Sequence, residues 1–204
     1  MTPRPRSSGR LHGDSGAALV EFALVAPVIV LFLVGIIEYG TVFKTNNQLQ
    51  SSLMSAGRVA GQGSDAWTAD YEALRSLDST LSGLKNAKIT KVIIYKVGPG
   101  DSGKVSSNCL GVVPSASTTA GVAGSCNVYS ATQVKALGPS PGFNDTCSIS
   151  AWDSHFCPNT RAPQSDRIGV YVELAYTPLT GLVPTNKKIS GYAVYDVEPV
   201  PIGS

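Results

Sequence analysis

The feature that most constrains this chain is an apolar run near its amino terminus. From Ala17 to Ile37 there are 21 residues, and only Glu21 among them is charged. A helix rises about 1.5 Å per residue, so this run as a helix would match the roughly 30 Å hydrocarbon core of a bilayer. Because such a helix would be apolar on every face, a small soluble domain could hardly bury it. We therefore predict one membrane-spanning helix over 17–37.

The charges on either side of this run predict its orientation. Three arginines precede it, whereas Glu38 follows it and Lys44 is the first lysine after it. Basic residues that flank a span stay in the cytoplasm. We therefore expect a cytoplasmic leader over 1–16 and an exoplasmic remainder. A secretory signal peptide is the alternative, but its apolar region runs for only about 7–15 residues and ends in small residues.

The charge of the rest of the chain is balanced. The net charge is +2, and the leader supplies all of it; from residue 17 onward there are 13 basic and 13 acidic residues. Proteins that bind nucleic acid by neutralising phosphates need a basic surface. We therefore expect no nucleic-acid partner.

The position of Glu21 needs an explanation, because an ionisable residue inside a span costs about 2.5–3.5 kcal/mol at mid-bilayer. One interpretation is that Glu21 lies near enough to the boundary to reach the headgroups. The other uses its spacing from Gly16: cleavage there would make Ala17 the amino terminus and Glu21 the fifth residue. The carboxylate could then pair with that ammonium group, or with the one of a neighbouring subunit, and so set the axial register of an assembly.

A basic leader, Gly-x-x-x-x-Glu and an apolar run together form the cleavage signature of type IV prepilins, and Glu21-Phe22 resembles the Glu-Tyr pair of tight-adherence (Tad) pilins. The resemblance to the TadE/TadG-like family of pseudopilins extends over four segments: Gly16–Pro27, Gly35–Gly40, Gln48–Gln50 and Ala56–Ala60. One departure is Ser55, which stands where many members carry a charged residue.

The resemblance implies that a prepilin peptidase cleaves between Gly16 and Ala17, and that Glu21 and Phe22 act in assembly. It also implies a structural role, without enzymatic turnover, in a Tad-type pilus assembly system. The implied partners are the peptidase, other pilin or pseudopilin subunits, membrane platform proteins and the lipid bilayer. The alternative from another class is a membrane-anchored exoplasmic binding module or enzyme that keeps its leader.

Beyond Gly40 the apolar residues recur at helical spacing, so the helix should continue outward to about Ala60 as an amphipathic stalk over 38–62. A second helix should begin near Ser64 or Asp65 and end at Gly83. Runs rich in β-branched or alternating apolar residues predict three strands, over 89–97, 168–176 and 189–197.

These elements predict an α+β fold in which the long amino-terminal helix packs on a small antiparallel sheet. The resemblance implies the same type IV pilin-like plan. The exoplasmic head would span 63–204, and it would carry a loop insertion over 98–166 that is rich in Ser, Thr, Gly and Ala.

All four cysteines lie in that insertion, at Cys109, Cys126, Cys147 and Cys157. In an oxidising compartment an even number predicts two disulfides, and four cysteines allow three pairings. We favour the most local one, Cys109–Cys126 with Cys147–Cys157. A zinc site is the competing interpretation, but structural zinc sites usually have ligands two to four residues apart, and this spacing does not occur here. We predict no metal.

Two motifs suggest enzymatic chemistry without completing it. Gly98 to Lys104 fits a phosphate-binding loop up to the lysine, but Val105 stands where a Ser or Thr must hold magnesium. We interpret this segment as a turn. His155 is the one histidine outside the leader, and we interpret it as a surface residue. We therefore predict no catalytic residue and no cofactor.

Overall fold

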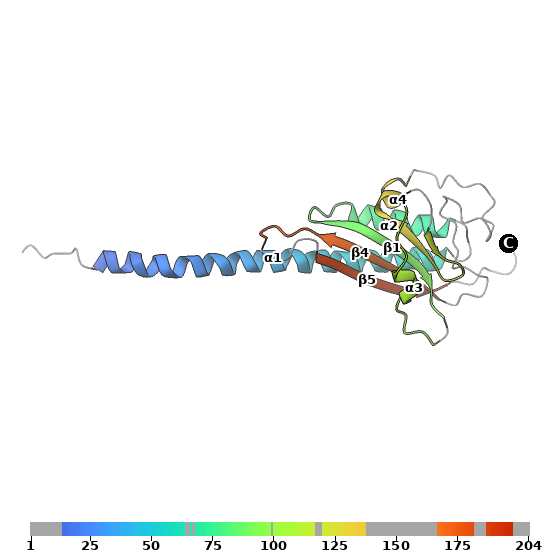
Figure 1. The fold of residues 1–204 in the computed structure, drawn as a ribbon, viewed down its shortest axis with the longest axis horizontal. Coiled ribbons are helices and arrows are strands. Elements are labelled where there is room, and N and C mark those ends of the chain that lie inside the picture. The colour runs from blue at the N-terminus through green and yellow to red at the C-terminus, as the bar shows by residue number, and fades with distance from the viewer. Residues whose placement is uncertain are drawn as a thin grey trace, which may run out of the picture.

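The computed structural model describes residues 14–63, 66, 68–98, 100–116, 120–137, 167–181 and 187–197. Its longest element is helix α1 (Asp14–Gln62), with 49 residues, which corresponds to a rod about 73 Å long. The amino-terminal half of α1 projects away from the remainder of the fold, and its carboxyl-terminal half packs against it (Figure 1).

The packed half of α1 confirms the predicted amphipathic stalk. Leu49, Leu53, Ala56 and Ala60 are all fully buried, and they lie on one stripe of the helix. The helix continues through Pro27 and ends at Gln62, close to the predicted end.

Helix α2 (Ala69–Leu81) starts later than predicted. The expected start at Ser64 or Asp65 lies outside the described residues, and the helix begins after Thr68. Asp70 and Glu72 lie in its first turn, where acidic side chains interact favourably with the helix dipole. Its apolar face is buried, as the sequence predicts.

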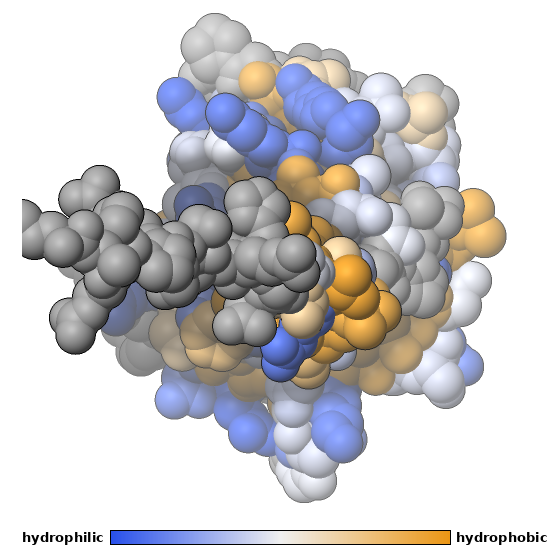
Figure 2. Space-filling view, turned by 90° about the vertical axis from the view of Figure 1, so that its left-hand side faces the viewer, coloured by the Kyte–Doolittle hydropathy of each residue, from blue (hydrophilic) through white to orange (hydrophobic). Residues whose placement is uncertain are grey.

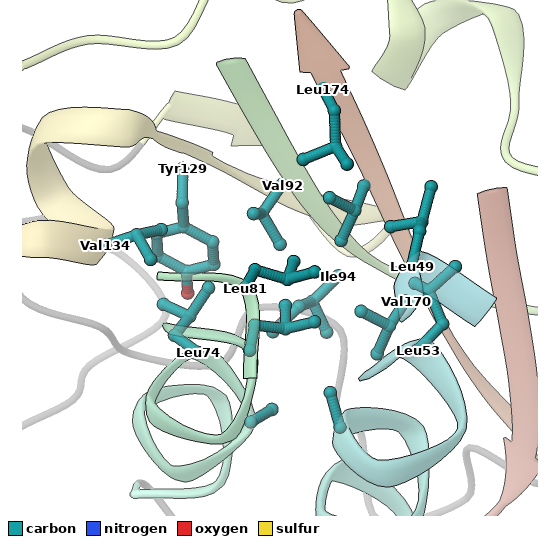
Figure 3. Packing of buried hydrophobic residues seen from close by; sticks show 14 of the residues in the cluster. Leu49, Leu53, Leu74, Leu81, Val92, Ile94, Tyr129, Val134, Val170 and Leu174 are labelled. Atoms are coloured by element: carbon teal, nitrogen blue, oxygen red, sulfur yellow. The ribbon is translucent and has the colours of Figure 1, made fainter. Parts of the chain in front are cut away.

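The sheet has five antiparallel strands in the order β2-β3-β1-β4-β5. The three predicted strands are confirmed, with boundaries moved by up to two residues. They are β1 (Ala87–Lys96), β4 (Arg167–Tyr176) and β5 (Lys187–Asp196). Helices α1 and α2 lie side by side against one face of this sheet (Figures 1 and 3).

The predicted loop insertion is in part wrong, because it supplies two strands and two short helices. These are α3 (Ser107–Leu110), β2 (Ala120–Val122), β3 (Cys126–Ser130) and α4 (Ala131–Lys135). Strand β3 pairs with β1 and is buried along its whole length. The prediction missed it because β3 has only five residues and is buried on both faces, so it shows no apolar alternation, while Asn127 and Ser130 interrupt an apolar run.

The main core lies between the two helices and the sheet (Figure 3). Leu49 and Leu53 come from α1, Leu74 from α2, and Val92 and Ile94 from β1. Burying each such side chain contributes roughly 1.5–3 kcal/mol. A smaller cluster covers the opposite face of the sheet, where successive side chains of β1 point the other way; it contains Ile93, Tyr95, Val97, Cys109, Cys126 and Val128.

Candidate functional site

The amino-terminal half of α1 is an apolar surface that the fold leaves uncovered. Its large side chains are exposed in the monomer, for example Phe22 at 67% and Leu24 at 73%. This helix is long and apolar enough to cross a membrane, and none of its most apolar window is buried. Exposing such a surface to water is unfavourable, so this half of α1 could lie in a bilayer or against other helices.

The residues of the predicted cleavage and assembly site lie on this bare segment. Gly16, Ala17, Glu21 and Phe22 are all exposed on the first turns of α1. Ala17 and Glu21 are four positions apart in one continuous helix, so they share a face. The helical geometry therefore allows the proposed pairing of ammonium and carboxylate, while cleavage and the roles of these residues stay predictions.

Glu38 lies where the bare half of α1 ends, and it is 1% exposed. Its carboxylate accepts hydrogen bonds from the Tyr176 hydroxyl (3.0 Å), the Leu179 amide (3.0 Å), the Thr180 amide (3.1 Å) and the Thr180 hydroxyl (2.9 Å). Thr41, one turn further along α1, contacts the Tyr176 hydroxyl at 2.6 Å. Glu38 thus fastens the end of β4 and the turn after it to α1.

These hydrogen bonds determine the charge state of Glu38. Burial raises the pKa of this carboxyl group, but the side chains of Thr180 and Tyr176 and the amides of Thr180 and Leu179 outweigh burial and hold the pKa below its ordinary value. At neutral pH Glu38 is therefore an anion held by donors rather than by a cation. Burial, with the neighbouring Glu38 anion, raises the pKa of Tyr176, so its hydroxyl stays a donor.

In the sequence Glu38 is a flanking charge and part of the Gly35–Gly40 segment of the resemblance, and neither feature predicts this attachment. The usable signal was its position directly after 21 residues with one charge. Its partners lie more than 130 residues further along the chain, and no local pattern identifies them.

Glycines bring α1 into close contact with β5. A Cβ atom at Gly57 would overlap the ring of Tyr195, and one at Gly61 would lie 2.7 Å from the backbone oxygen of Asp196. From the strand side, a Cβ at Gly191 would lie 2.8 Å from Leu53. The glycines on α1 and on β5, which have no Cβ atom, therefore allow the short distance between the helix and the sheet.

A buried polar group ties α2 to the inserted strand β3. The Asp70 carboxylate accepts hydrogen bonds from the Asn127 amide (2.8 Å) and the Tyr129 hydroxyl (2.8 Å), and all three residues are fully buried. Buried polar groups are costly unless they are hydrogen-bonded, so these contacts favour one arrangement of α2 on the sheet.

The glycine-rich segment after β1 is a turn, as predicted. The Asp101 amide donates to the Gly98 carbonyl at 3.1 Å, and the Gly98 amide donates to the Asp101 carboxylate at 2.8 Å. The Asp101 carboxylate therefore accepts from the Gly98 amide, a group that in a phosphate-binding loop would donate to the bound anion.

The predicted Cys109–Cys126 disulfide is confirmed, and it joins α3 to β3. The predicted Cys147–Cys157 pair and His155 lie outside the described residues.

Residues 16–58 match the model of the TadE-like protein family. No curated protein and no solved structure matches the chain. The match begins at Gly16, covers the bare half of α1 and extends to Arg58 on its packed half. The matched residues therefore lie within α1 alone, and α2 and the sheet lie beyond them.

Proposed function

From the TadE-like domain at residues 16–58, we propose that this chain is a minor, pilin-like structural component of a Tad-type (type IV) pilus assembly system. The observation that carries the proposal is the start of the match at Gly16, the residue after which the sequence predicts cleavage. The proposed role is to support pilus biogenesis or adhesion without enzymatic turnover.

The proposed processing releases residues 1–16 and makes Ala17 the amino terminus. A prepilin peptidase would cut at the junction of the basic leader and the apolar run. The new ammonium group would lie one helical turn from Glu21, on its own chain or on a neighbouring subunit, and an ion pair would offset much of the cost of placing Glu21 among apolar groups.

The proposed location follows from the uncovered half of α1. Residues 17–37 would span the membrane, the leader would lie in the cytoplasm, and the stalk (38–62) and head (63–204) would lie outside. During assembly this apolar rod would leave the lipid for contacts with apolar helices of other pilin or pseudopilin subunits and of membrane platform proteins.

Intact-mass measurement of the protein extracted from its native membrane tests the proposal. We expect a chain that begins at Ala17 in cells with the prepilin peptidase, and at Met1 in cells without it. Gly16→Leu should block this cleavage, whereas the matched control Gly13→Leu should leave it unchanged. Retention of residues 1–16 in peptidase-containing cells would favour the alternative, an anchored exoplasmic binding module or enzyme.

A further inference from the structure

The end of the head that faces the bare half of α1 carries a group of exposed lysines from three parts of the chain. We call this group the basal lysines; they are Lys44, Lys85, Lys88, Lys187 and Lys188. Lys44 comes from α1, Lys85 and Lys88 from the turn into β1 and its start, and Lys187 and Lys188 from the start of β5. Figure 2 views this end of the molecule and shows hydrophilic groups on opposite sides of the apolar helix.

Shared surface hollows place these lysines at one level along α1. Lys85 lines a hollow with Lys44 and the α1 segment 41–48, and Lys187 and Lys188 line another with 39–46 of α1. Lys88 belongs to the same end, since it pairs with Ala175, which in turn pairs with Lys188. At about 1.5 Å per residue, residues 41–48 lie roughly 6–16 Å beyond Ile37.

Three acidic groups at this end offset part of the lysine charge and leave an excess of two positive charges. Glu38 is buried and engaged by hydrogen bonds. Glu173 forms an ion pair with Lys188 at 3.2 Å, and Asp78 lines a hollow with Lys88. The chain beyond the leader is neutral in total, yet it concentrates five lysines at one end.

Aromatic and apolar side chains accompany the basal lysines. Tyr39 is 74% exposed and Phe43 is 67% exposed, and they lie one turn apart on α1 next to Lys187. Leu179, in the turn that Glu38 holds, is 54% exposed. Aromatic residues next to a span favour the headgroup level of a bilayer, where lysines extend their ammonium groups toward phosphates.

We propose that the basal lysines bind the headgroups of anionic phospholipids in the leaflet that α1 leaves, so that the head lies on the membrane before assembly. This inference rests on the membrane-spanning part of the proposed function and is independent of the pilus role. The lysines lie within about one Debye length of the headgroup layer, which extends roughly 5–7 Å beyond the hydrocarbon core. Attraction to an anionic surface acts over this distance.

Hydrogen exchange of the full chain, reconstituted at one copy per nanodisc, tests the inference. We compare discs of phosphatidylcholine with discs that also contain phosphatidylglycerol. Amides of 81–88 and 177–181 should exchange on the order of tenfold more slowly in the anionic discs. High salt should remove this protection, and the segment 98–104 should exchange equally in both discs.

Two matched variants show whether the basal lysines cause the protection from exchange. Replacement of Lys44, Lys85, Lys187 and Lys188 by Gln should abolish the protection. Replacement by Gln of four basic residues away from this end should retain it; these are Arg58, Arg75, Lys96 and Lys104, none of which is buried. Equal exchange in both kinds of disc, or equal behaviour of the two variants, would overturn lipid binding by the basal lysines. A chain that fails to insert into any disc would instead contradict the proposed span.

Discussion

At the scale of single residues, Glu38 joins two parts of the chain that are distant in sequence. A carboxylate directly after an apolar run would ordinarily be exposed to solvent, whereas the Glu38 carboxylate is almost completely buried. Its four donors come from β4 and the turn that follows it. Since a buried anion without donors would be costly, Tyr176, Leu179 and Thr180 make burial of Glu38 possible.

The lowered pKa of Glu38 predicts a pH-dependent contribution to folding stability. A carboxyl group whose pKa is lower in the folded state stabilises the protein at pH values above its ordinary pKa of 4.5. This contribution is lost as the pH falls from 4.5 through the lowered pKa. Glu38→Gln should therefore lower the Tm of the full chain in detergent at pH 7, and it should lower it less at acidic pH.

Circular dichroism melts from neutral pH to below the ordinary pKa check this. The matched control Glu173→Gln removes a carboxylate that is 17% exposed and pairs with Lys188, and this variant should retain the loss of stability at acidic pH that Glu38 causes. Equal pH profiles for wild type and Glu38→Gln would contradict the assignment.

At the scale of elements, the contact of α1 with β5 depends on glycines rather than on large interlocking side chains. Gly57 allows Tyr195 to lie against the helix backbone, and Gly191 makes room for Leu53 and Gln50. Because protein interiors tolerate little added volume, this contact should be sensitive to a single methyl group.

Gly57→Ala should destabilise the fold by about 1–2 kcal/mol. Overpacking against Tyr195 costs roughly 1–3 kcal/mol, and the higher helix propensity of alanine offsets up to about 1 kcal/mol of that. Gly40→Ala is the matched control in the same helix, since a Cβ there meets nothing within 4 Å; it should be neutral or stabilising. Chemical denaturation of both variants measures the difference, and equal free energies of unfolding would refute tight packing at Gly57.

The Cys109–Cys126 disulfide fixes α3 against the inserted strand β3. It closes a loop with a sequence separation of 17, for which restriction of the unfolded chain predicts a stabilisation of about 3 kcal/mol. The double variant Cys109→Ala, Cys126→Ala should lose roughly 2–4 kcal/mol. In a variant without Cys147 and Cys157, reductant should cause a similar loss in a thermal melt. An unchanged Tm in the first variant would argue against this contribution.

The elements that could be predicted from sequence are those whose pattern is local. The burial of Leu49, Leu53, Ala56 and Ala60 follows from helical spacing, and β4 follows from its apolar alternation. Strand β3 could not be predicted in the same way, because its Asn127 is stabilised by Asp70 on a distant helix. The same holds for Glu38, whose role depends on partners that only the folded chain brings near.

At the scale of the whole molecule, one helix serves two environments. The TadE-like match includes residues from both halves of this helix, from Gly16 on the bare half to Arg58 on the packed half. The head buries the second half and leaves the first for lipid or for other subunits (Figure 1). Charge is also distributed unevenly, since the chain beyond the leader is neutral in total but collects lysines at the end of the head next to the bare half of α1.

Glu21→Ala should impair pilus assembly more than membrane insertion. Removing the carboxylate makes the span more apolar, so insertion should persist. It would also leave the new amino terminus without its partner in the assembled state, so the number of pili per cell should fall on the order of tenfold or more. Glu72→Ala, which removes an exposed carboxylate from α2, is the control. Unchanged piliation in Glu21→Ala cells, counted by electron microscopy, would contradict the pairing.

The attachment of the head to α1 has a mechanical consequence. Glu38 at one end of the contact and Gly57 at the other both require the same alignment of rod and sheet. A shift by a single helical turn, about 5.4 Å, would withdraw the carboxylate from its donors and drive side chains into the Tyr195 ring. We therefore expect a load applied along α1 to reach the head without a shift of the helix along the sheet.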